Sequence, residues 1–176
     1  MIKLIKQEKD KLLYWEIWEE DKKTLIVHCG CVGDTGEMYE IELYPFQRVE
    51  EEMKELADEH LADGYKVLDE EELIEFVLQY DYTGDQLEEA LEKRNQVQEM
   101  MDEALGWSGN GHCDGGDIGS GTINVFTFVI DVDKALQTTL EELKNQQLFD
   151  GVKIAYMNDE EDYIQVYPSE GEFNLL

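Results

Sequence analysis

Alternating apolar and polar residues in the first part of the chain predict an antiparallel meander. Within residues 24–31 (TLIVHCGC), the alternation places Leu25, Val27, Cys29 and Cys31 on one face, and Thr24, Ile26 and His28 on the other. The predicted strands are residues 2–6, 12–19, 24–31 and 37–43, with a tight turn at 33–36. Trp15 and Trp18 lie three residues apart, so we expect them on opposite faces.

After this meander, apolar residues recur at helical spacing. We expect a helix from Pro45 to about residue 63, ending before Gly64, and a second helix at about 70–80. The expected core stripe of the first helix is Phe46, Val49, Met53, Leu56, Ala57 and Leu61; that of the second is Leu73, Ile74, Phe76, Val77 and Tyr80.

The segment Tyr82-Thr83-Gly84 is the best boundary between two halves, and it divides the chain into residues 1–84 and 85–176. The second half begins with a helix, for which Asp85 and Glu88 resemble a capping box. The elements expected there are helix 85–105, glycine-rich loop 106–121, strand 122–130, helix 132–146, and strands 152–157 and 162–167. The expected fold class is therefore α+β: a meander with a packed helix, then an α+β sandwich with a mostly antiparallel sheet.

Residues 14 to about 67 resemble a WGR domain, a small module of poly(ADP-ribose) polymerases and many bacterial proteins. The likeness rests on the aromatic strand 14–18 (YWEIW), the segment 30–36 (GCVGDTG), and a helix that ends at 60–65 (HLADGY). Cys29 stands where the family has its signature Trp, and Cys31 where it has an Arg that helps contact DNA or a neighbouring domain. The resemblance therefore implies the fold but not DNA binding. The second half, around GHCDGGDIGSGT, resembles a segment found beside WGR-like domains in uncharacterised bacterial proteins.

The net charge limits the classes of partner that we expect the chain to bind. The 176 residues include 14 Lys plus Arg and 43 Asp plus Glu, which gives a formal net charge of −29. Such a surface disfavours nucleic acids and anionic membranes, and it attracts a basic protein or a divalent cation. No run of about 18 apolar residues predicts a membrane span. Three cysteines without CxxC spacing, and no visible secretory signal, predict a reducing cytoplasm.

The glycine-rich loop holds the candidate chemistry. Residues 106–121 contain seven of the 14 glycines, but no Gly-Lys-Ser/Thr ending, so a phosphate-binding loop is a weak prediction. The candidate binding residues are Trp107, His112, Cys113, Asp114, Asp117 and Ser120. No cofactor is expected, and the spacing of His112, Cys113, Asp114 and Asp117 fits no zinc pattern. A structural hairpin or Ω-type loop is the main alternative to a site.

Two functions follow from these patterns. The first is a non-enzymatic, acidic protein-binding module of the bacterial cytosol, such as an immunity or inhibitor-type protein for a basic partner. The second is a small-ligand-binding protein or enzyme whose site lies at the glycine-rich loop, around His112, Cys113, Asp114 and Asp117. We predict no catalytic residues; cysteine catalysis by Cys113 would need an activated thiolate in an electropositive setting, which this composition makes scarce.

Overall fold

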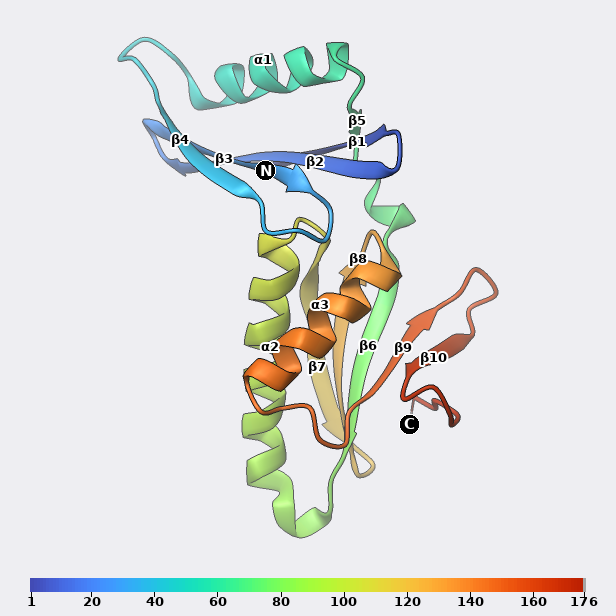
Figure 1. The fold of residues 1–176 in the computed structure, drawn as a ribbon. Helices are drawn as coiled ribbons and strands as arrows, with labels where there is room; N and C mark the ends of the chain where they lie inside the picture. Colours follow the sequence, from blue (N-terminus) through green and yellow to red (C-terminus); the bar gives the residue numbers. More distant parts are fainter. Residues whose placement is uncertain (176) are drawn as a thin grey trace. The chain divides into compact units, whose positions relative to one another are not determined.

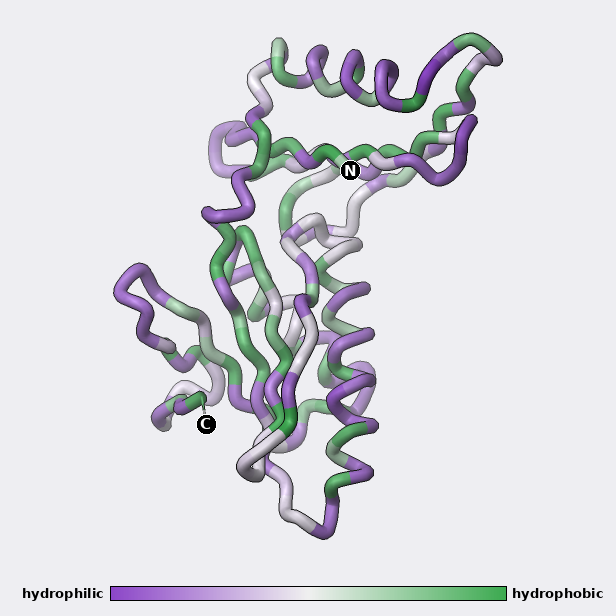
Figure 2. Tube along the Cα trace, turned by 180° about the vertical axis from the view of Figure 1, so that it is seen from behind, coloured by the Kyte–Doolittle hydropathy of each residue, from purple (hydrophilic) through white to green (hydrophobic). Residues whose placement is uncertain are grey.

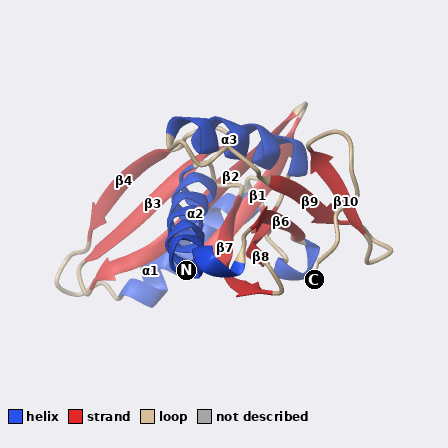
Figure 3. Cartoon of the chain, turned by 90° about the horizontal axis from the view of Figure 1, so that it is seen from below, coloured by secondary structure: helices blue, strands red, loops and turns tan. Residues whose placement is uncertain are grey.

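The chain folds into two compact units, Met1–Glu72 and Leu73–Leu176, in a computed structural model that describes residues 1–175 (Figure 1). Each unit contains one five-stranded sheet, and every pair of neighbouring strands is antiparallel. Helices and strands are shown by type in Figure 3. The predicted α+β class is confirmed.

The first unit is the predicted meander with additional pairing at one edge. Its sheet has the order β4-β3-β2-β1-β5, so the four meander strands lie side by side. The elements are β1 (Ile2–Glu8), β2 (Lys11–Asp21), β3 (Thr24–Cys31), β4 (Glu37–Glu42), α1 (Val49–Ala62) and β5 (Lys66–Val67). The short strand β5, which was not predicted, pairs with β1 through Leu4 and Ile5.

Helix α1 covers one face of the first sheet. Met53 and Ala57 of α1 pack against Leu25 and Val27 of β3, and Cys29 packs beside this core, as the alternation predicts. Trp15 is buried on the same face, where its ring stacks on His60 with centroids 4.2 Å apart. Residues on this face therefore come from four strands, β1 to β4, and from the helix.

The first turn expected for this helix is not helical. Helix α1 begins at Val49 instead of Pro45, and residues 45–46 form a turn. Phe46, expected in the core stripe, is 98% exposed, and Leu61 is also exposed. The predicted stripe is confirmed at Met53 and Ala57, which are buried, and at Val49 and Leu56, which pack against them; it is wrong at its two ends, Phe46 and Leu61.

The second unit contains two long helices and a sheet with the order β10-β9-β6-β8-β7. Its elements are β6 (Ile74–Asp81), α2 (Leu87–Trp107), β7 (Gly111–Gly119), β8 (Thr122–Val129), α3 (Val132–Asn145), β9 (Lys153–Met157) and β10 (Tyr163–Tyr167). The predicted helices at 85–105 and 132–146 and the last three predicted strands are confirmed. The helix start differs in detail: a 3-10 turn, Gly84–Gln86, precedes α2, and Thr83 and Gln86 form the capping box of that turn in place of Asp85 and Glu88.

The helix predicted at 70–80 is wrong. Residues Glu70–Glu72 form one turn of 3-10 helix, and Ile74–Asp81 form β6, the central strand of the second sheet. Strand β6 is buried on both faces, so apolar residues follow one another without clear alternation. Contacts therefore divide the chain after Glu72, whereas the sequence suggested Gly84.

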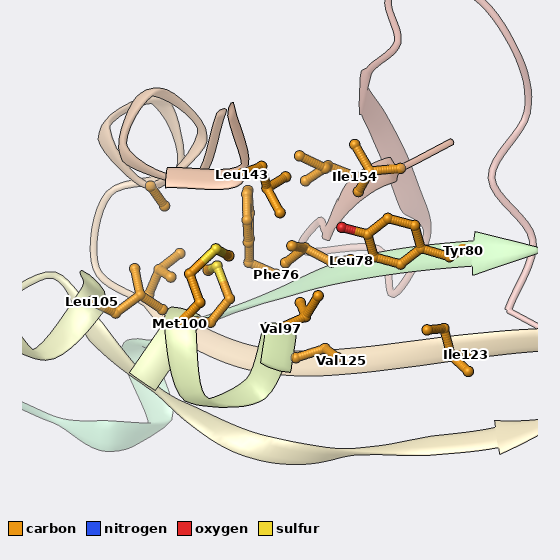
Figure 4. Close-up of a cluster of buried hydrophobic side chains, with 14 of the residues drawn as sticks. Phe76, Leu78, Tyr80, Val97, Met100, Leu105, Ile123, Val125, Leu143 and Ile154 are labelled. Atoms are coloured by element: carbon orange, nitrogen blue, oxygen red, sulfur yellow. The ribbon is translucent and has the colours of Figure 1, made fainter. Parts of the chain in front are cut away.

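The main core of the second unit lies between its sheet and helices α2 and α3 (Figure 4). Phe76, Leu78 and Tyr80 of β6 point into it, and Tyr80 donates its hydroxyl to the Leu148 carbonyl at 2.8 Å. Other strands and both helices supply the remaining labelled side chains: Val97, Met100, Leu105, Ile123, Val125, Leu143 and Ile154. Apolar stretches along the strands and polar stretches along α2 are visible in Figure 2.

Among the residues that the structure describes, none of the helices combines the length and the apolar character needed to cross a bilayer.

Candidate functional site

The glycine-rich segment is mostly a strand, not the long loop that its composition predicts. Helix α2 extends to Trp107, a short turn follows, and residues Gly111–Gly119 form β7 at the edge of the second sheet. The glycines allow close strand pairing: a Cβ on Gly111 would lie 1.9 Å from the Phe128 carbonyl oxygen, and one on Gly116 would lie 2.5 Å from that of Asn124. Larger residues at these two positions would push β7 away from β8.

His112 and Cys113 point to opposite sides of the second sheet. The His112 ring lies 5.8 Å from the Phe128 ring, whereas Cys113 packs against the core beneath α2 and α3. The Cys113 thiol faces the Phe126 carbonyl oxygen at 3.5 Å, and its backbone N–H donates to Asp102 of α2 at 3.3 Å. His112 therefore has no position from which to deprotonate the Cys113 thiol.

The surroundings of Cys113 favour the neutral thiol. Burial raises the pKa of Cys113 above its ordinary value, and the negative charges of Asp102 and Asp114 raise it further. A nucleophilic cysteine needs the opposite environment, with a nearby cation or helix N-terminus that lowers the pKa. This electrostatic setting does not support cysteine catalysis.

Asp117 belongs to a row of polar side chains on the face away from the helices. Its carboxylate accepts a hydrogen bond from Asn124 Nδ2 at 2.7 Å, and Gln79 Nε2 donates to the side-chain oxygen Oδ1 of Asn124 at 2.9 Å. Gln79 also donates to the backbone carbonyl of Asn174 at 3.0 Å, near the end of the described chain. These hydrogen bonds join β7, β8 and β6 to this last segment, and the Asp117 carboxylate is one of the groups that form them.

The remaining predicted residues have separate positions. Asp114 is exposed at a β-bulge between Cys113 and Gly115. Ser120, at φ 52°, and Gly121, at φ 87°, form the two-residue turn between β7 and β8. Trp107 is 48% exposed at the end of α2. Thus the structure distributes the predicted residues over two sheet faces, a bulge, a turn and a helix end.

No potential metal centre is found in the described part of the chain. Within residues 1–175, no group of three or more His, Cys, Asp or Glu side chains is arranged to hold a metal ion.

The first unit contains a buried polar network that was not predicted from the sequence. Lys3, Glu16 and His28 are direct neighbours across β1, β2 and β3. The Glu16 carboxylate lies 3.1 Å from Lys3 Nζ and 2.8 Å from His28 Nδ1, and His28 Nε2 lies 2.9 Å from the Tyr14 hydroxyl. Glu16 is 7% exposed and His28 2% exposed.

Hydrogen bonds link Glu16, His28 and Tyr14. A carboxylate accepts hydrogen bonds, so His28 Nδ1–H donates to Glu16, and His28 Nε2 is hydrogen-bonded to the Tyr14 hydroxyl. Burial, followed by the charge of Glu16, raises the pKa of Tyr14 and keeps its hydroxyl protonated. The network is therefore largely buried, and its polar groups are paired with one another.

Glycines of the segment that resembles the WGR motif make space for this network. A Cβ on Gly36 would lie 1.9 Å from the Tyr14 hydroxyl oxygen and 2.6 Å from His28 Nε2. Gly30, opposite Tyr14 in the β2–β3 register, would bring a Cβ to 3.3 Å from the Tyr14 ring. The spacing of these glycines was the available signal of the network in the sequence, because it indicates that a large side chain approaches the backbone closely.

Comparison with protein-family models, curated proteins and solved structures gives no match for this chain.

Proposed function

We propose that this chain is a non-enzymatic, acidic protein-binding module of the bacterial cytosol whose partner is a basic protein. The observation that carries the proposal is the ratio of 43 acidic to 14 basic side chains, because internal ion pairing must leave at least 29 carboxylates uncompensated. An excess of this size attracts a cationic surface and accelerates its association.

Exposed carboxylates occur along both units. Glu50 and Glu51 are exposed at the start of α1, and Glu37 and Glu40 are exposed on β4. In the second unit, all four acidic residues of 159–162, between β9 and β10, are exposed. The acidity therefore belongs to the surface, where it is available to a partner.

The alternative function, a ligand or enzyme site in the glycine-rich segment, has less support. Its four residues do not converge, Cys113 has a raised pKa, and Asp117 is hydrogen-bonded within the sheet. A site of that kind needs several polar groups directed at one point.

An immunity or inhibitor-type role fits the same physical chemistry. An enzyme that degrades nucleic acid binds phosphates through Lys and Arg, and surface carboxylates present a similar charge to these side chains. The WGR resemblance stays a prediction, since neither the fold nor the comparisons test it.

A pull-down tests the proposal. The tagged full chain is incubated with bacterial lysate and washed at about 0.1 M and then about 0.5 M salt, which shortens the electrostatic screening length about twofold. We expect one basic protein, in near-stoichiometric amount, to stay at the lower salt concentration and dissociate at the higher one. Immobilised polyglutamate is the control for proteins that bind any polyanion. Retention of nothing by the folded chain, or of the same proteins by polyglutamate, would overturn the proposal.

A further inference from the structure

The turn between β4 and α1 exposes two aromatic side chains. Phe46 is 98% exposed and Tyr44 is 76% exposed, although both are large apolar groups that normally gain free energy from burial. Phe46 lies outside the core beneath α1, so its position is not explained by packing of the first unit.

Hydrogen bonds hold the turn in one conformation. The Gln47 N–H donates to the Tyr44 carbonyl at 2.9 Å, and the Tyr44 N–H donates to Gln47 Oε1 at 2.7 Å. The Leu43 N–H donates to the Lys23 carbonyl at 2.7 Å, which fastens the start of the turn to the end of the β2–β3 hairpin. Pro45 restricts its own φ angle. A partner would meet a preformed turn, and so less conformational entropy would be lost on binding.

Carboxylates surround this turn in the sequence. Residues 40–52 contain five Glu and one cation, Arg48, whose guanidinium lies 3.1 Å from the Glu51 carboxylate. The turn therefore combines an exposed apolar centre with acidic flanks. Charge complementarity calls for a partner surface with an apolar pocket between Lys or Arg side chains. A second copy of this chain is a poor partner, because its net charge is also −29.

We propose that Phe46, supported by Tyr44, is the apolar anchor through which this chain docks on a basic protein. The inference rests on the proposed function and assigns it a surface. Aromatic side chains near the centre of an interface supply a large share of the binding free energy, whereas charges at its rim mainly affect association rate and salt dependence. Phe46 is expected to act in the first way, and Glu50, Glu51 and Glu52 in the second.

Site-specific crosslinking gives the first test. The full chain carries the photoreactive residue p-benzoylphenylalanine in place of Phe46, is irradiated in bacterial lysate, and its adduct is identified by mass spectrometry. We expect one basic protein, crosslinked within an apolar pocket that has Lys or Arg at its edge. The same photoreactive residue in place of Leu87, which is also exposed, should not form this adduct. An adduct with a second copy of the chain, with lipid, or with an acidic protein would overturn the proposal, as would no adduct.

The second test is a binding titration of the chain and its variants with the purified partner that crosslinking identifies. Phe46→Ala should weaken binding by about 10- to 150-fold, the factor that corresponds to burial of one phenylalanine side chain, while Leu87→Ala stays within about twofold. Both variants should unfold at the wild-type temperature, since neither side chain is buried. Equal affinities of the two variants would refute the anchor but leave salt-dependent binding, and thus the proposed function, intact. If the wild-type chain shows no salt-dependent binding, both the Phe46 anchor and the proposed function are refuted.

Discussion

Replacing Glu16 by alanine should destabilise the first unit by about 1–4 kcal/mol. The substitution leaves His28 Nδ1–H, which is buried, without its acceptor at 2.8 Å, and a buried unsatisfied donor costs about 1–3 kcal/mol. It also removes the carboxylate 3.1 Å from Lys3 Nζ. Lys3 is partly exposed and can be rehydrated, so this second loss adds at most about 1 kcal/mol. Glu16→Gln keeps an acceptor for His28 and should cost roughly half as much.

Urea unfolding followed by circular dichroism and tryptophan fluorescence measures this loss. Trp15 and Trp18 report the first unit and Trp107 the second, so two transitions are fitted where they separate. With a slope of about 2 kcal/mol per molar urea, the midpoint of the first unit should decrease by about 0.5–2 M. Glu19→Ala, an exposed carboxylate on the same strand, is the matched control and should change the midpoint little. If Glu16→Ala and Glu19→Ala shift the midpoint equally, the buried network does not contribute as argued.

Three further predictions concern the second unit. Ser120→Asn should stabilise it by about 0.5 kcal/mol and Ser120→Val should destabilise it by about 1–2 kcal/mol, because Ser120 has a φ of 52° in a tight turn; urea midpoints that move in the same direction would contradict this explanation. The thiol of Cys113 should react with iodoacetamide more slowly than free cysteine at about pH 8, since its pKa is raised by burial and by Asp102; per-site mass spectrometry measures the rate, and a faster reaction would revive the enzyme hypothesis. Burial also raises the pKa of Tyr80 above its ordinary value of 10.0, so the neutral phenol stabilises the fold below about pH 10 and this contribution decreases as pH rises. Between about pH 8 and pH 11, wild type should therefore lose more stability than Tyr80→Phe, as measured by urea unfolding; equal losses would show that Tyr80 is not responsible.

The meander could be predicted because side chains alternate between two faces along β3. Leu25 and Val27 face α1, whereas Ile26 and His28 lie on the other face, where they are buried as well. Strand β6 gave no such pattern. Val77 contacts Ala155 and Phe173 on one face, while Phe76 and Leu78 enter the main core on the other. A strand that is buried on both faces has apolar residues at helical spacing as well, and periodicity cannot distinguish the two structures.

The candidate site was predicted less well than the fold, for two physical reasons. Glycine is depleted in strands, so residues 111–119 were assigned to a loop, although Gly111 and Gly116 are required by the close approach of β8. Contacts across strands also depend on register, which the sequence does not specify directly. The buried contact of His28 with Glu16 is of this kind, and so is the separation of His112 from Cys113.

The central position of β6 has a consequence for synthesis on the ribosome. Strand β6 is made first among the strands of its sheet, yet one of its partners, β9, ends at Met157. At typical translation rates, β6 waits on the order of 4–15 s for that strand. During this time one edge of an apolar, β-prone strand is unpaired, and such an edge favours aggregation. The three glutamates 70–72 before it and Asp81 at its end place charge at both ends of the nascent strand. We expect these charges to oppose association of newly made chains until the sheet closes.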